Sequence, residues 1–159
     1  MNQILSIKKF YLLIFVLSIF VILSAIYIEY IVGAKACVLC IYQRFPFIAA
    51  IFFSYFGYNN SKKYIWIYLI IVTFFISFIL SGYHVGIENN IFPEYKECSV
   101  ENLNVSDKDQ LLNSLSETPP NCKDVNFRIF SLSLATINVL ISLIVVIISI
   151  LLLKYEKNR

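Results

Sequence analysis

Four long apolar runs constrain this chain more than any other feature of its sequence. They cover residues 10–32, 41–58, 64–86 and 129–153. Each falls within the range of about 17–25 residues that an α-helix needs to cross a bilayer. The runs lack both the alternating pattern of membrane-barrel strands and turn signals every ~10 residues. We therefore predict an all-α membrane protein, built as a four-helix transmembrane bundle.

Composition and charge narrow the class further. Hydrophobic residues make up 59% of the 159 residues and charged residues only 14%, which is more apolar surface than a soluble domain of this size can bury. The low content of Gly and Pro excludes low-complexity and collagen-like classes. A net charge of +3 is too small to indicate a nucleic-acid partner. We expect a single integral membrane domain over residues 1–159.

The distribution of charge predicts the orientation of the bundle. Positively charged residues in short loops and tails are retained on the cytoplasmic side. Both termini are therefore expected in the cytoplasm, with the loops 33–40 and 87–128 outside. Within the longer, acidic loop, residues 105–115 are expected to form a short amphipathic helix on the membrane surface. The positive residues of the two tails and of the hairpin after the second run are Lys8, Lys9, Lys62, Lys63, Lys154, Lys157 and Arg159.

One alternative concerns processing of the first run. Ala34, Lys35 and Ala36 form an A-x-A sequence directly before Cys37, which is typical of a signal-peptide cleavage site. The preceding run is longer than the 7–15 apolar residues usual in a signal peptide. Cleavage would also leave three spans, so we favour a retained first span.

All four cysteines, Cys37, Cys40, Cys98 and Cys122, fall in the two loops expected outside. This placement indicates thiol and disulfide chemistry in an oxidising compartment. Cys37 and Cys40 form a C-x-x-C, whose small ring is readily opened and closed. A static disulfide is one alternative, and half of a zinc site is another. Zinc needs two further Cys or His ligands nearby, and the chain has a single His, so we predict no metal.

Residues around the start of the second run indicate a reactive thiol with an arginine and a cavity beside it. Cys40 directly precedes the run, and a helix N-terminus favours a thiolate. Arg44 follows four residues later on the same helical face. It is either an interfacial anchor or a group that stabilises a thiolate or hydrogen-bonds a quinone carbonyl. Pro46 removes a backbone bond to Tyr42, which predicts an opened or kinked first turn and helps to form a cavity.

The segment CVLCIYQR at residues 37–44 resembles the bacterial disulfide bond formation protein B (DsbB) family. The similarity continues over nearly the whole chain, with the same four-span plan and the same order of cysteines. Where many relatives carry Trp and Gly before the fourth span, this chain has Phe127 and Ser131, and the long loop matches least well. The other similar segments are GYHVGIE at 82–88, CKDV at 122–125, FSLSLA at 130–135 and Asn138.

The resemblance implies roles for the cysteines. Cys37 and Cys40 would form the redox pair beside a bound quinone, and Cys98 and Cys122 would form a second pair. In the family, the second disulfide receives electrons from a soluble thioredoxin-fold oxidase, DsbA. Cys98 would be the residue that joins the mixed disulfide with this partner.

The resemblance also implies a cofactor site for ubiquinone or menaquinone. Arg44 would help to bind the quinone, and His84 matches a position near the quinone site. For His84, a helix-end histidine that faces interfacial water is an equally open interpretation.

Together these features predict a quinone-dependent thiol oxidase of the bacterial inner membrane, with its cysteines in the periplasm. It would reoxidise a DsbA-like dithiol oxidase and pass the electrons to quinone. Two alternatives stay open at this point. One is a vitamin K epoxide reductase-type enzyme, in which the C-x-x-C nearest the quinone lies towards the end of the bundle. The other is a non-enzymatic membrane scaffold with static disulfides.

Overall fold

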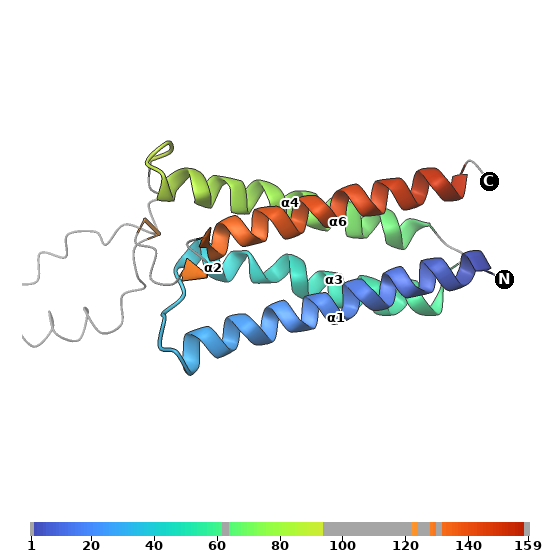
Figure 1. Ribbon diagram of the computed structural model, residues 1–159, viewed down its shortest axis with the longest axis horizontal. Helices are drawn as coiled ribbons and strands as arrows, with labels where there is room; N and C mark the ends of the chain where they lie inside the picture. The colour runs from blue at the N-terminus through green and yellow to red at the C-terminus, as the bar shows by residue number, and fades with distance from the viewer. Residues whose placement is uncertain (1, 62–63, 94–121, 124–127, 130–131, 158–159) are drawn as a thin grey trace, which may run out of the picture.

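The computed structural model describes residues 2–61, 64–93, 122–123, 128–129 and 132–157. Both chain ends lie at the same end of a bundle of long helices, and a short helix caps the opposite end (Figure 1). The long loop at 94–121, with its expected amphipathic helix, lies outside the described residues. The helices are α1 (Asn2–Tyr30), α2 (Val38–Tyr42), α3 (Arg44–Asn59), α4 (Ile65–Glu88) and α6 (Leu134–Lys157).

Within the described part of the chain, four segments are long and apolar enough to cross a membrane, which confirms the predicted four-helix membrane bundle. Their bounds differ from the predicted runs, because the first and second begin earlier and the third ends later than expected. The segments are Ile7–Tyr30, Val38–Asn59, Ile65–Glu88 and Leu134–Tyr155.

The fourth helix begins later than its apolar run. Two short strands, β1 (Arg128–Ile129) and β2 (Leu132–Ser133), pair antiparallel just before it, with Arg128 opposite Ser133. The Oγ atom of Ser133 accepts a hydrogen bond from the backbone N–H of Thr136 at 3.1 Å. This is the geometry of a serine N-cap, which fixes the first turn of a helix. Apolar composition alone does not distinguish this strand pair from the helix that follows.

The second span is broken at Gln43. Helix α2 ends at Tyr42 and α3 begins at Arg44, with Pro46 in its first turn. Proline has no N–H to donate, so it is tolerated only where the helix leaves that bond unmade. The predicted opening of these turns is confirmed. The span consists of two helices, α2 and α3, that meet at Gln43.

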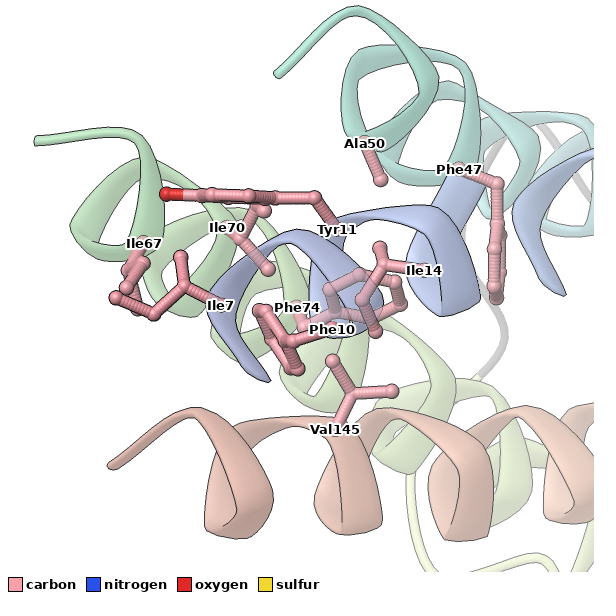
Figure 2. Packing of buried hydrophobic residues seen from close by; sticks show 10 residues of the cluster. All are labelled: Ile7, Phe10, Tyr11, Ile14, Phe47, Ala50, Ile67, Ile70, Phe74 and Val145. Atoms are coloured by element: carbon pink, nitrogen blue, oxygen red, sulfur yellow. The ribbon is translucent and has the colours of Figure 1, made fainter. Parts of the chain in front are cut away.

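The hydrophobic core lies between the helices, where side chains of α1, α3, α4 and α6 pack together (Figure 2). Helix α1 packs mainly on α3, and α4 packs mainly on α6. The rings of Phe47 and Phe74 meet edge to face at 5.5 Å, a favoured aromatic geometry. The buried cluster consists of Ile7, Phe10, Tyr11, Ile14, Phe47, Ala50, Ile67, Ile70, Phe74 and Val145.

Candidate active site

Cys37 and Cys40 lie at the start of α2, at the end of the bundle away from the termini (Figure 1). Both are free thiols, and their Sγ atoms are 2.9 Å apart. Cys37 is the N-cap of α2, and its Sγ accepts the backbone N–H of Cys40 at 3.3 Å. The prediction that the helix begins after Cys40 is therefore wrong. The helix starts at Val38, so the favoured N-terminal position belongs to Cys37.

The surroundings of Cys37 stabilise its thiolate. The hydrogen bond from the Cys40 side chain is the largest cause that lowers the pKa of Cys37, and His84 adds to it against the opposing effect of burial. The resulting pKa of Cys37 is about 4. A thiolate at neutral pH is the reactive form in disulfide exchange. Cys37 is thus the activated sulfur of the C-x-x-C.

Cys122, which follows the long loop in the sequence, also lies beside Cys37. Its side chain is buried, and its sulfur is in a disulfide. The sulfur atoms of Cys122 and Cys37 and a ring nitrogen of His84 all lie within 4.8 Å of one another. A sulfur in a disulfide is not the thiolate that zinc requires, so the cluster suits disulfide exchange better than metal binding. Cys98 lies outside the described residues.

His84 is buried beside the cysteines rather than exposed to interfacial water. Only 3% of its surface is accessible. Its Nε2 lies 3.7 Å from Cys37 Sγ and 3.8 Å from a carboxylate oxygen of Glu88. The water-facing interpretation is wrong because the ring is turned inward, where it contacts Cys37, Gln43 and Glu88.

Arg44 pairs with a carboxylate from the first helix. Its guanidinium lies 2.6 Å from Glu29, and both side chains are about one-quarter exposed. The ion pair joins α3 to α1. Cys40 and His84 account for the lowered pKa of Cys37, so the predicted role of Arg44 in stabilising a thiolate gains no support from it.

A cavity of about 360 Å³ opens beside these groups. Cys37, Cys40, Arg44 and His84 border it, and most of its remaining wall is apolar. Small-molecule sites typically combine such apolar walls, in volumes of about 300–1,000 Å³, with a few polar groups. The apolar side chains come mainly from α1 and α6: Phe20, Val21, Ile22, Ala25, Ile28, Leu134, Ala135, Ile137 and Ile141.

Four polar residues of the site received no role from the sequence: Glu29, Gln43, Glu88 and Asn138. Gln43 hydrogen-bonds His84, and Asn138 hydrogen-bonds Gln43. Polar side chains inside apolar spans are costly unless they are paired. That cost was a usable signal, because each of the four lies inside a span or at its end.

Comparison with known proteins identifies a family whose match includes the residues of this site. A family model described as "Disulfide bond formation protein DsbB" matches residues 7–152. The chain therefore belongs to the DsbB family of membrane proteins for disulfide bond formation, which implies a disulfide oxidoreductase role. It is also 30% identical over 159 residues to "Uncharacterized protein RP370" of Rickettsia prowazekii (strain Madrid E). That similarity covers 96% of this chain and 91% of the relative.

Proposed function

We propose that this protein is a quinone-dependent membrane thiol oxidase that reoxidises a periplasmic DsbA-like dithiol oxidase. One observation carries the proposal. The thiols of Cys37 and Cys40 border an apolar cavity, and the sulfur of disulfide-bonded Cys122 lies within 4.8 Å of Cys37. Electrons therefore have a short path from one cysteine pair to the other.

The first exchange takes place at the second pair. Cys122 is in a disulfide while Cys37 and Cys40 are free, and Cys98 is the remaining cysteine of the chain. We assign Cys98 as the partner of Cys122. A thiolate of the DsbA-like protein attacks Cys98, and the Cys98–Cys122 bond breaks. The partner's second cysteine then displaces Cys98, which leaves the partner oxidised and the loop pair reduced.

The second exchange moves the same two electrons to the C-x-x-C. Starting from an oxidised Cys37–Cys40 pair, the thiolate of Cys122 attacks the nearby sulfur of Cys37, and Cys40 leaves with the electron pair. Cys98 then attacks Cys122, and Cys37 leaves as a thiolate. A low pKa makes Cys37 a good leaving group. In the product, Cys37 and Cys40 are free thiols and Cys122 is in a disulfide, as they are in the structure.

The cavity suits a flat, apolar ring with hydrogen-bond acceptors. Its walls are mainly apolar, and Arg44 and His84 supply polar hydrogen at its border. Arg44 would orient a carbonyl oxygen, and the side chains of α1 and α6 would exclude water. Ubiquinone or menaquinone, when bound, would accept the two electrons and two protons from the C-x-x-C pair.

The proposal includes an orientation in the bacterial inner membrane. The cysteines lie at one end of the bundle and both termini lie at the other (Figure 1). Among the described residues, Lys8, Lys9 and Lys154 belong to the terminal end, near the start of α1 and the end of α6. By the retention of positive charge in the cytoplasm, the termini would be cytoplasmic and the cysteines periplasmic. The free thiols of Cys37 and Cys40 weigh against a scaffold with two static disulfides.

Trapping of the mixed disulfide tests the proposed entry point. A thioredoxin-fold oxidase that has lost its resolving cysteine is mixed with the full chain, and the linked peptides are identified by mass spectrometry. We expect linkage to Cys98. Linkage to Cys37 instead, with Cys98 unmodified, would remove the loop pair from the electron path.

A further inference from the structure

A chain of buried polar side chains runs from the centre of the bundle to the reactive cysteine. It starts at Ser77 and Ser142, continues through Asn138 and Gln43, and ends at His84. All five residues are at most 8% exposed. The hydroxyls of Ser77 and Ser142 lie 3.0 Å apart, and each is within 3.4 Å of Asn138 Oδ1. Inside an apolar bundle the members of such a chain satisfy one another's hydrogen bonds.

The hydrogen bonds run in one direction from the serines. The serine hydroxyls donate to Asn138 Oδ1. Asn138 Nδ2 then donates to Gln43 Oε1 at 3.0 Å. With its oxygen occupied, Gln43 presents its Nε2 hydrogens to His84 Nδ1 at 2.9 Å. An amide nitrogen donates and does not accept, so Nδ1 of His84 must be the unprotonated, accepting nitrogen.

The other side of the imidazole ring requires the same arrangement. Nε2 faces the sulfur of Cys37 at 3.7 Å and a carboxylate oxygen of Glu88 at 3.8 Å, and the backbone of Cys122 adds a hydrogen bond to the ring. A thiolate and a carboxylate are acceptors. Nε2 must therefore carry hydrogen, and the two sides of the ring agree independently.

We propose that Asn138 and Gln43 are positioning residues that hold His84 as the neutral imidazole with its proton on Nε2. In this tautomer, Nε2 donates towards Cys37 and has no free electron pair with which to accept a proton. His84 is then a hydrogen-bond donor to the Cys37 thiolate and not its general base. This role of His84 in disulfide exchange rests on the proposed function, whereas the tautomer of His84 does not.

The single histidine of the chain makes this inference directly measurable. Histidine labelled with ¹⁵N is incorporated into the full chain, and two-bond ¹H–¹⁵N correlation spectra are recorded in detergent at neutral pH. We expect a pyridine-type shift for Nδ1 and a pyrrole-type shift for Nε2. An imidazolium signal, or the reversed assignment, would overturn the proposal. The measurement needs no quinone, partner or turnover, so its failure is distinct from failure of the proposed function.

Variants test whether the amides set the tautomer. Asn138→Leu removes the group that orients Gln43 and keeps the same branched arrangement of side-chain heavy atoms. Without Asn138, Gln43 can turn its oxygen towards Nδ1, while Nε2 keeps its hydrogen towards Cys37 and Glu88. We therefore expect Nδ1 to take up a proton and an imidazolium signal to appear at neutral pH. Ser149→Ala is the matched control, because Ser149 is also buried on α6 but donates to Val145 of its own helix. The control should keep the single tautomer.

A second variant covers the case in which Asn138→Leu does not fold. Ser77→Ala combined with Ser142→Ala removes the donors that orient Asn138, and the imidazolium signal should again appear. If folded Asn138→Leu, or the double serine variant in its place, keeps the single tautomer, the relay does not control His84 and the proposal is wrong.

Discussion

The guanidinium of Arg44 lies 2.6 Å from the carboxylate of Glu29, so that α3 and α1 are joined by an ion pair beside the apolar cavity. This pair gives Arg44 a fixed position from which its remaining donors can meet a ligand. A partly exposed ion pair of this kind contributes at most about 1 kcal/mol to stability. Its main effect is expected on the binding of quinone.

Replacement of Arg44 tests that role. Arg44→His should raise the KM for quinone by about tenfold or more, because a charge-assisted hydrogen bond is worth about 1.5–3 kcal/mol. Thermal unfolding in detergent should change little. Glu29→Gln keeps the arginine but loses the charge that fixes its position, so the KM should rise by a smaller factor than in Arg44→His. An unchanged KM in Arg44→His would reduce Arg44 to an interfacial anchor.

The lowered pKa of Cys37 predicts a pH profile for the reduced protein. Alkylation of Cys37 by a small reagent should be nearly constant at neutral pH and should fall by half near pH 4, where the thiolate gains a proton. The stabilisation of the reduced fold by this thiolate is complete above the ordinary thiol pKa of about 8.5 and is lost as the pH falls through the lowered value. Mass spectrometry of the Cys37 peptide gives the profile.

Two variants at Cys40 separate the causes of that profile. Cys40→Ala removes the hydrogen bond that is the largest cause of the shift, so the midpoint should move up towards the ordinary value. Cys40→Ser retains a donor and should keep most of the shift. Equal midpoints for the two variants would show that this hydrogen bond does not control Cys37.

A close contact between α1 and α3 predicts a difference between two glycines. A Cβ atom at Gly57 would overlap the buried ring of Tyr11, whereas a Cβ at Gly82 would meet nothing within 4 Å. Gly57→Ala should therefore destabilise the bundle by about 1–3 kcal/mol, as overpacked cores do. Gly82→Ala should be neutral or slightly stabilising, because alanine favours helix. Thermal unfolding in detergent compares the two, and equal stabilities would contradict the packing described for Tyr11.

The sequence predicted the fold well because crossing a bilayer demands long apolar helices, and such runs are visible without any structure. The ends of the helices were harder to place. Ser133 caps α6 after a strand pair that lies partly within the same apolar run, and Cys37 caps α2 ahead of the run predicted to start at residue 41. Both boundaries depend on local hydrogen bonds rather than on composition.

The site was predictable in its residues but not in its geometry. C-x-x-C spacing and Arg44 stand out in the sequence, but nothing in it places Cys122 beside Cys37 or turns His84 inward. Gln43 and Asn138 lie in different spans, and only the packed bundle brings their amides together. Contacts between residues distant in the sequence require the tertiary structure.

The two cysteine pairs should be separable by substitution. Cys98→Ser should abolish oxidation of a DsbA-like partner, because the partner then has no disulfide to attack. A small dithiol that reaches Cys37 directly should still support quinone reduction by this variant. Thiol quantification of the partner and absorbance of the quinone follow the two activities. Partner oxidation at the original rate in Cys98→Ser would contradict the assigned order of exchange.

The most direct test is quinone reduction by the purified full chain in detergent, followed by absorbance while a reduced thioredoxin-fold oxidase is supplied as electron donor. Ubiquinone and menaquinone analogues are tested separately. We predict turnover with at least one of them in the unaltered protein and none in Cys40→Ser. Turnover that persists in Cys40→Ser, or its absence with both quinones in protein shown to be folded, would contradict a quinone-linked thiol oxidase.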